Sequence, residues 1–275
     1  MPPVDAELGV FGGSGFYAFL DDVEEVAVDT PWGPPAAPVA VGEVGGRRVA
    51  FLPRHGRRHE LPPHKVNYRA NVWALRSLGV RRILAPCACG SLRADVHPGD
   101  VVVCDQLVDR TWGRPDTYFD GPGANHVAFA DPYCPELRAV ALAAAHDTGM
   151  PAHDGGTVVV VQGPRFSTRA ESRWFRSSGW DVVNMTQHPE AVLARELGLC
   201  YATLALVTDY DTGVEGVEGA GPVSQAEVFT FFEENVHRLR DLLLRALPEV
   251  PAERSCACAE GANGVEPVPP AEGAG

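Results

Sequence analysis

The sequence predicts a single-domain α/β protein whose mixed, largely parallel central sheet is flanked by helices. Two observations lead to this prediction. Short β-rich runs alternate with segments of helical periodicity along most of the chain, as in a sheet of parallel strands joined by helices. The chain has 275 residues, 45% of them hydrophobic, which is enough to bury one large core.

Strands are expected where short runs of apolar residues are bounded by turn residues. They cover residues 8–11, 39–44, 48–52, 82–85, 101–104, 157–161, 182–184 and 203–207. Gly45 and Gly46 lie between the second and third of these runs and predict a hairpin turn.

Helices are expected where apolar residues recur at helical spacing. They cover residues 67–78, 135–148, 169–178, 189–197 and 224–247. Two of them begin with capping boxes, in which Thr168 pairs with Glu171 and Ser224 with Glu227.

The end of the chain differs in composition from the rest. From Pro251 onward it consists largely of proline, glycine, alanine and glutamate, which bury too little apolar surface to offset the entropy of ordering. We therefore expect residues 1–250 to form the folded domain and residues 251–275 to be a flexible tail.

Charge and composition exclude several classes of protein. The formal net charge of −13 argues against a nucleic-acid partner, because phosphate-backbone binding needs a broad basic surface. The longest apolar stretches are too short to cross a bilayer, and the N-terminus lacks a basic segment followed by an apolar one. The seven cysteines do not form a small secreted disulfide framework. We expect a cytoplasmic protein without membrane contact.

Two segments are candidates for anion binding. Residues 12–15 (Gly-Gly-Ser-Gly) follow a strand, and such a turn lets backbone N–H groups approach an anion while Ser14 adds a hydroxyl. Residues 53–59 form a dense basic cluster after another strand, where the fork of Arg54 and the imidazole of His55 suit a tetrahedral oxyanion. A plain structural turn and a solvated basic loop are the alternatives.

Two further segments could surround a ligand. Residues 87–92 end a strand in small side chains, which leave room at the carboxyl end of the sheet; close packing of a buried turn is the alternative. Residues 163–171 form a strand-to-helix loop in which Phe166 could stack on a base or simply anchor the loop.

Residues 183–186 (Val-Asn-Met-Thr) are followed at a short distance by a second buried strand, which ends in an acidic pair. The Asp-x-Asp spacing of Asp209 and Asp211 puts both carboxylates on the same side of an extended chain, facing one cavity. A solvated loop end is the alternative interpretation.

Metal ligands are present, but their spacing does not favour a site. A zinc site at His55, His59 and His64 lacks an obvious fourth ligand. Hard cations want more oxygen ligands than Asp209 and Asp211 offer. We expect no metal and no organic cofactor.

Together these segments resemble the methylthioadenosine phosphorylase branch of the purine nucleoside phosphorylase family, whose fold the predicted α/β sheet would share. The resemblance runs from about residue 8 to residue 247. The motifs that match in order are Gly-Gly-Ser-Gly at 12–15, Arg-His-Gly at 54–56, Lys-Val-Asn-Tyr at 65–68, Ala-Cys-Gly-Ser-Leu at 88–92, Pro-Gly-Asp at 98–100, Asp-Arg-Thr at 109–111, residues 163–171, Asn-Met-Thr at 184–186 and Thr-Asp-Tyr-Asp at 208–211.

The resemblance implies a site with several parts. The phosphate site it implies consists of Ser14, Arg54, His55, Cys87, Ala88 and Thr186. The purine site consists of Phe166, Ser167, Asp209 and Asp211, with Met185 beneath the ribose. The pocket for the 5′ group consists of Gln225, Val228 and, from a neighbouring subunit, His126. A homo-oligomer, either a trimer or a dimer of trimers, is therefore also implied.

The activity that the resemblance implies is reversible phosphorolysis of 5′-deoxy-5′-(methylthio)adenosine to adenine and 5-methylthio-ribose 1-phosphate. His55 belongs to the catalytic group, inorganic phosphate is a co-substrate and no cofactor takes part. An Asp209 kept protonated by burial would pass its proton to N7 of the leaving adenine, and Asp211 would contact the 6-amino group.

Three departures leave the 5′ substituent open between methylthio, hydroxyl and halogen. Cys87 stands where a threonine hydroxyl often binds phosphate, Gln225 where an aliphatic residue is usual, and the long C-terminal helix of animal forms is missing. Cys256 and Cys258 resemble a pair found near the end of some thermophilic relatives, where it can be oxidised; a redox role is the alternative, and in a flexible tail we expect no role for them. The alternatives are a 6-oxopurine nucleoside phosphorylase, a hydrolytic nucleosidase and a non-catalytic purine-binding protein.

Overall fold

The computed structural model describes residues 5–13, 16, 19–121, 124–217 and 221–267, and within them a mixed sheet with helices on both faces. The strands are β1 (Leu8–Gly12), β2 (Glu24–Val26), β3 (Val39–Val44), β4 (Arg47–Pro53), β5 (Arg82–Ser91), β6 (Val101–Val103), β7 (Gln106–Arg110), β8 (Ala152–Asp154), β9 (Thr157–Val161), β10 (Val182–Asn184) and β11 (Cys200–Asp209). The α-helices are α1 (Tyr68–Ser77), α2 (Pro135–Asp147), α3 (Arg169–Ser177), α4 (Gln187–Glu196) and α5 (Gln225–Ala246).

Strand β5 is the centre of the sheet. It pairs in parallel with β1 and β11 and antiparallel with β10. From β1 the sheet continues through β4 and β3 to β2, from β10 through β9 to β7, and from β11 through β6 to β8. Most of these pairs are parallel, which confirms the predicted fold class.

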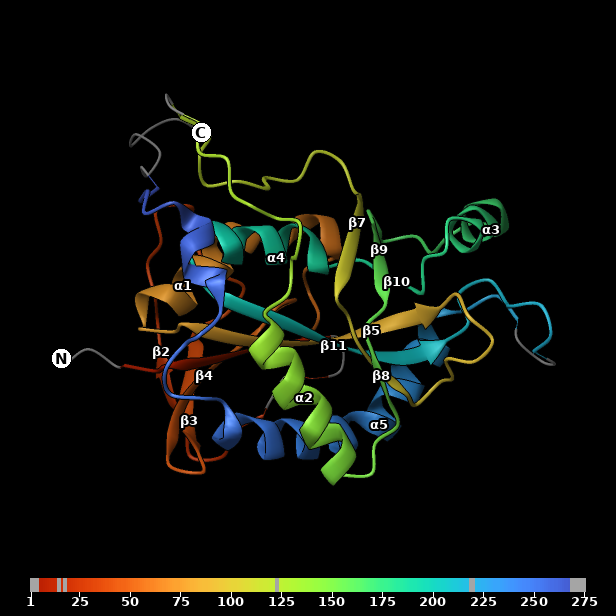
Figure 1. Cartoon of the computed structure of the whole chain (residues 1–275), viewed down its shortest axis with the longest axis horizontal. Helices are drawn as coiled ribbons and strands as arrows, with labels where there is room; N and C mark the ends of the chain where they lie inside the picture. The colour runs from red at the N-terminus through yellow and green to blue at the C-terminus, as the bar shows by residue number, and fades with distance from the viewer. Residues whose placement is uncertain (1–4, 14–15, 17–18, 122–123, 218–220, 268–275) are drawn as a thin grey trace.

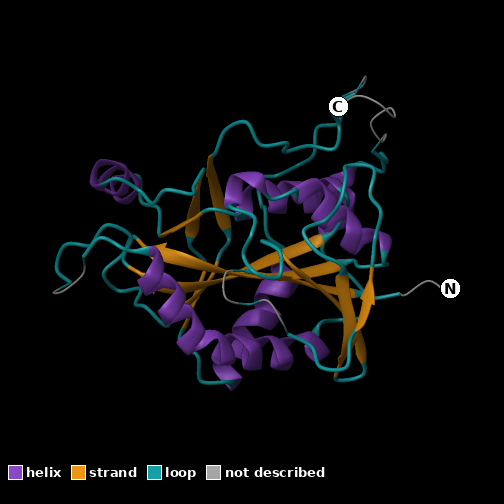
Figure 2. Ribbon diagram, turned by 180° about the vertical axis from the view of Figure 1, so that it is seen from behind, coloured by secondary structure: helices purple, strands orange, loops and turns teal. Residues whose placement is uncertain are grey.

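Two apolar cores lie on opposite faces of the sheet because side chains alternate along each strand. On β11, Tyr201 and Val207 belong to the core beneath α1 and α4, whereas Leu204 and Leu206 belong to the core beneath α2 and α5. Figures 1 and 2 show these two helix pairs on either side of the strands, with α3 projecting from one end. Among the described residues, no helix has the length and apolarity to span a membrane.

The local signals for turns and helix ends are confirmed. Gly45 and Gly46 both have positive φ and join β3 to β4, a conformation that favours glycine. Thr168 and Ser224 cap α3 and α5, each forming both hydrogen bonds of a capping box.

The strands differ from the prediction in two ways. Strand β5 does not end near Ala85 but runs to Ser91, because its small residues pair with β11 as far as Gly90, so Cys87 and Ala88 lie in a strand rather than a turn. Strands β2, β7 and β8 were not predicted. They are short or largely exposed, so no alternation of buried and exposed residues marks them.

The tail prediction also differs from the structure as far as residue 267. Residues 257–262 form a 3-10 helix, and Cys258 in it is buried. Buried Arg82 binds the carbonyl of Glu253, and Arg76 forms an ion pair with Glu266. Composition alone could not reveal this packing, because a few anchoring side chains produce it. Residues 268–275 lie outside the described part of the chain.

Candidate active site

A cavity of about 270 Å³ opens where the carboxyl ends of β5, β10 and β11 meet the loop before α3 and the first turn of α5. This is the usual position for ligands in open α/β sheets. The predicted site residues that line it are Arg54, His55, Cys87, Ala88, Phe166, Ser167, Met185, Thr186, Asp209, Asp211, Gln225 and Val228.

Two predicted residues are not among those that line the cavity. Ser14 lies outside the described residues, although its neighbour Gly13 lines the cavity. His126 is exposed and contributes nothing to the cavity of its own chain.

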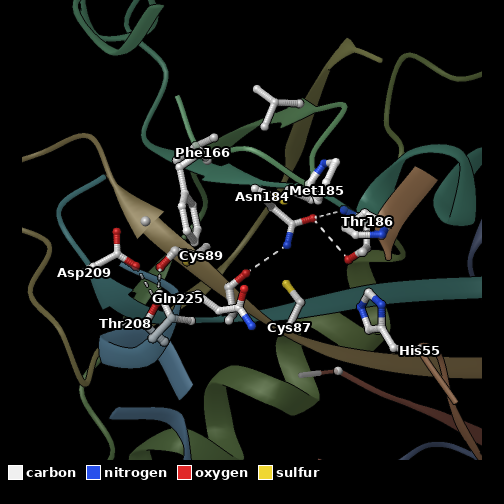
Figure 3. A pocket seen from close by; sticks show the side chains of 18 of the residues that line it. His55, Cys87, Cys89, Phe166, Asn184, Met185, Thr186, Thr208, Asp209 and Gln225 are labelled. Carbon is white, nitrogen blue, oxygen red and sulfur yellow. Dashed lines mark hydrogen bonds between the residues drawn. The ribbon is translucent and has the colours of Figure 1, made fainter. Parts of the chain in front are cut away.

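The cavity has two chemically different ends. We call Arg54, His55 and Thr186 its basic end, and Asp209 and Asp211 its acidic end. Figure 3 shows His55 and Thr186 on one side and Asp209 on the other.

Arg54 at the basic end is buried and already holds a counter-ion. Its Nε and Nη2 atoms donate to the two carboxylate oxygens of Glu190 at 2.5 and 2.6 Å. Burial lowers the pKa of Arg54, but the attraction of Glu190 outweighs it and the net shift is upward. Nη1, which does not contact Glu190, donates a long hydrogen bond of 3.4 Å to the carbonyl of Pro86 and lies beside Gly13, where an added Cβ would come within 3.4 Å of it.

His55 is neutral at physiological pH. Burial, followed by the charge of Arg54, lowers its pKa to about 3. Its Nδ1 lies 2.8 Å from the carbonyl oxygen of Leu61. Since a carbonyl only accepts hydrogen bonds, Nδ1 carries the proton and Nε2 is left as an acceptor.

Only part of the basic cluster at residues 53–59 faces the cavity. Arg57 is half exposed and forms an ion pair with Glu25 at 2.5 Å, and neither it nor Arg58 lines the cavity. Of the basic residues in this segment, Arg54, His55 and His59 line the cavity, with the turn at Gly56, whose φ is positive, between His55 and His59.

Asn184 organises the turn between β10 and α4. Its Nδ2 donates to the carbonyl of Ala88 at 2.9 Å, and its Oδ1 accepts from the backbone N–H groups of Thr186 and Gln187 at 2.7 and 2.9 Å. Figure 3 shows the bond between Asn184 and Thr186 in the middle of the cavity wall. Asn184 therefore ties the turn that carries Met185 to the central strand.

Arg114 secures the other side of that turn. Its Nη1 donates to the carbonyls of Met185 and His188 at 2.9 and 2.6 Å, and its Nη2 to the carbonyl of Gln162 at 2.7 Å. One buried guanidinium thus joins the Met185 turn to the loop that carries Phe166.

At the acidic end, both carboxylate oxygens of Asp209 accept a hydrogen bond. Oδ2 accepts from the hydroxyl of Thr208 and Oδ1 from the backbone N–H of Asp211, both at 2.7 Å. Gly90 is required opposite, because a Cβ there would lie 2.8 Å from Oδ1. Asp211 has a positive φ of 54° just beyond β11, so the pair faces one cavity through a turn rather than through strand alternation.

Both acidic groups are shifted toward their neutral forms. Burial raises the pKa of Asp209 to about 6, against the opposing effect of its two hydrogen bonds. Burial also raises the pKa of Asp211, although the hydroxyls of Ser172 and Ser167 oppose the shift. A carboxyl group with a pKa close to neutral is suited to proton transfer.

This shift predicts a pH dependence of stability. A carboxyl whose pKa rises from 3.8 to about 6 on folding stabilises the fold below pH 4, and that contribution disappears as the pH rises through 6. Relative to Asp209→Asn, the wild type should lose on the order of 2–3 kcal/mol of unfolding free energy between pH 4 and pH 7. Denaturant titrations of both proteins across this range measure it. A pH-independent difference would contradict the raised pKa.

The remaining wall combines an amide with apolar groups. Gln225, Val228 and Phe229 lie on one face of α5 at spacings of three and four residues and line the cavity. The ring of Phe229 meets that of His59 edge to face at 5.1 Å, and His59 lies 4.5 Å from the ring of His55.

Several of these residues were not assigned to the site from the sequence. The helical spacing of Gln225 and Val228 was a sufficient signal for Phe229, which follows on the same face. Asn184 lies in the Asn-Met-Thr motif at 184–186, which the sequence singled out without giving it a role. Arg114 and Glu190 act through contacts between distant segments, so local sequence carries no signal for them.

Comparison with known proteins assigns the chain to a family. The family model for the Phosphorylase superfamily matches residues 7–248, so the chain belongs to that superfamily. Two curated relatives are a purine nucleoside phosphorylase of Streptomyces coelicolor, 59% identical over 96% of this chain and 97% of its own, and an S-methyl-5′-thioadenosine phosphorylase of Mycolicibacterium smegmatis, 62% identical over 90% and 93%.

A solved structure agrees with these relatives. The methylthioadenosine phosphorylase of Schistosoma mansoni in complex with adenine is 39% identical, with a TM-score of 0.87 over 94% of this chain and 96% of its own. The chain is thus a nucleoside phosphorylase of the purine type, an enzyme that transfers a pentosyl group. The names of the relatives differ in the substrate they specify.

Proposed function

We propose that this enzyme cleaves 5′-deoxy-5′-(methylthio)adenosine with inorganic phosphate, giving adenine and 5-methylthio-ribose 1-phosphate. The observation that carries this proposal is the near-neutral pKa of Asp209 at the acidic end of a cavity whose other end holds Arg54 and His55. A purine leaving group needs a proton donor, which the acidic end supplies. An attacking phosphate needs hydrogen-bond donors and positive charge, which the basic end supplies.

The proposed reaction uses the two ends together. The C1′–N9 bond breaks toward an oxocarbenium-like sugar, which the phosphate dianion stabilises and then attacks to form the C1′–O bond. Asp209 passes its proton to N7, so adenine leaves as a neutral base. Nη1 of Arg54 and the hydroxyl of Thr186 donate to phosphate oxygens, while Nε2 of His55 accepts from the P–OH group.

The acidic end supports a 6-amino base. A carboxylate at Asp211 accepts from the exocyclic amine of adenine, whereas it would repel the O6 atom of hypoxanthine or guanine. Phe166 and Ser167 beside it supply a stacking face and a hydroxyl. The alternative is a 6-oxopurine nucleoside phosphorylase, which the general name of the Streptomyces relative leaves open.

Competition between nucleosides tests the choice of base. With phosphate saturating, methylthioadenosine, adenosine and inosine are supplied in equal amounts and the released bases are quantified. We expect adenine to be the main product and methylthioadenosine the preferred substrate. Preferential release of hypoxanthine would establish the 6-oxopurine alternative, and binding of all three without release would establish a non-catalytic protein.

Gln225 bears on the 5′ substituent. It lies at the start of α5, beside Val228 and Phe229, and its amide would accommodate a 5′-hydroxyl better than a thioether. Gln225→Leu should shift the ratio of kcat/KM for methylthioadenosine to that for adenosine by about tenfold toward the thioether. The ratio for adenosine against inosine serves as the control and should not change. An unchanged thioether ratio would remove Gln225 from the 5′ pocket.

We further propose a homotrimer or a dimer of trimers. His126 is exposed, and its carbonyl is held by Nδ2 of Asn263 at 2.9 Å, so the loop is supported while the ring is available to a neighbour. Cyclic closure would give every cavity one such ring. Sedimentation velocity at assay concentrations should reveal a trimer or hexamer. A fully active monomer would contradict the shared site.

The proposed setting is the cytoplasm, where the seven cysteines would form no disulfide bonds, as in the structure. The adenine product would serve purine salvage and the methylthio sugar phosphate methionine salvage.

A further inference from the structure

Four cysteines come together at the end of β11 opposite the cavity. Cys134 is the N-cap of α2, Cys200 begins β11, and Cys256 and Cys258 come from the segment after α5. Their Sγ atoms all lie within 4.8 Å of one another, the only such group of potential metal ligands found among the described residues. We call these four residues the cysteine cluster.

The surrounding backbone builds the cluster from distant segments. The N–H of Cys134 donates to the carbonyl of Tyr201 at 2.8 Å, which sets the start of α2 beside the start of β11. Glu136 accepts from the backbone N–H of Ser255 at 2.6 Å and pairs with Arg82. These contacts bring the Cys-x-Cys segment over the other two cysteines.

The distances between the sulfur atoms suit one tetrahedral ion. The Sγ of Cys256 lies 3.4 Å from that of Cys200 and 3.7 Å from that of Cys134. Four thiolates at about 2.3 Å from a zinc ion are separated by about 3.8 Å from one another, whereas bonded sulfur atoms are only about 2.05 Å apart. All four are free thiols in the structure.

The environment is that of a closed structural site. Three of the cysteines are buried and Cys256 is half-buried, so no position is left for a substrate or a reactive water. Cys134 is the N-cap of α2, so the N-terminus of that helix supplies partial positive charge to its thiolate.

We propose that the cysteine cluster binds one zinc ion through four thiolates, with the four thiol protons released to solvent. Tetrahedral sulfur ligation selects zinc or iron among common metals. We assign zinc, which has no redox chemistry, because the site is buried, has no open position and so has a structural role. This assignment replaces the expectation from sequence that the chain binds no metal.

The ion would fasten the C-terminal segment to the sheet. Cys256 and Cys258 begin the 3-10 helix whose last turn leads to Asn263, and Asn263 holds Asn125 and the carbonyl of His126, each at 2.9 Å. Zinc bound here therefore supports the loop that carries His126, independently of which substrate the enzyme cleaves.

Metal analysis of the whole enzyme tests the proposal. Protein purified under reducing conditions, without chelator or histidine tag, should contain about one zinc ion per chain when measured by inductively coupled plasma mass spectrometry. The variant Cys256→Ser/Cys258→Ser should contain almost none. Cys104→Ala is the matched control, because Cys104 is a buried free cysteine outside the cluster, and it should retain the full amount.

A second measurement on the wild type keeps the test valid if the double variant does not fold. X-ray absorption at the zinc edge should give four sulfur neighbours at about 2.3 Å. Wild-type protein without metal, iron in place of zinc, ligation by nitrogen or oxygen, or an intact mass lower by four hydrogens from two disulfide bonds would each overturn the proposal.

Discussion

Asp209→Asn should lower kcat/KM for methylthioadenosine by at least about a hundredfold, the scale of a lost general acid. The substitution is nearly isosteric. The amide oxygen can still accept from the N–H of Asp211, and Thr208 can turn its hydroxyl toward the carbonyl of Cys89, 3.2 Å away. What disappears is the proton that burial keeps on a group of pKa about 6.

The same variant should partly relieve the rejection of inosine. An asparagine amide can donate to O6 of hypoxanthine, which a carboxylate cannot do. Steady-state kinetics with both nucleosides measure the two effects, and a melting temperature at pH 7 no lower than that of the wild type shows that the fold is intact. Wild-type activity on methylthioadenosine would transfer the proton-donor role to Asp211 or to solvent.

Arg54→Ala should be the most damaging substitution in both activity and stability. It removes the Nη1 donor proposed for phosphate, a charge-assisted contact worth about 2–4 kcal/mol in the transition state. It also leaves the fully buried carboxylate of Glu190 without its counter-ion. The hydrogen bond from the hydroxyl of Tyr201, at 2.8 Å, is then its one remaining side-chain partner among the described residues. Breaking such a pair costs about 3–5 kcal/mol of unfolding free energy.

A matched control compares the loss of this buried ion pair with the loss of an exposed one. Arg93 also forms a bidentate contact, with Asp95, and a further ion pair with Asp181 at 2.9 Å, but its own side chain and that of Asp95 are exposed. Arg93→Ala should therefore cost no more than about 1 kcal/mol and leave the KM for phosphate unchanged. If Arg54→Ala behaved like Arg93→Ala in denaturation and in phosphate kinetics, both roles assigned to Arg54 would be wrong.

The sequence predicted the parts of the fold that depend on local chemistry. The turn at Gly45 and Gly46 and the caps at Thr168 and Ser224 follow from conformational preference and short-range hydrogen bonds, and all are found in the structure. Edge strands such as β7 and the packed segment around Cys258 depend on distant partners, and their composition resembles that of loops.

The residues of the candidate site also fall into those that local sequence indicates and those that depend on distant partners. Residues whose types suit an anion or a base, such as His55 and Asp209, could be named from the sequence and its family resemblance. Glu190 could not, because its significance arises only from its contact with Arg54 across the sheet. The cysteine cluster shows this most clearly, since three separate segments contribute to it and its Cys-x-Cys pair lies in a stretch whose composition is typical of disorder.

Product analysis with methylthioadenosine, with and without phosphate, tests the central claim most directly. With phosphate, the products should be adenine and 5-methylthio-ribose 1-phosphate in equal amounts. In phosphate-free buffer turnover should nearly stop, because the basic end of the cavity would have no anion to stabilise the developing sugar cation. Equal rates of adenine release without phosphate, together with free methylthioribose, would make the enzyme a hydrolase and contradict the account.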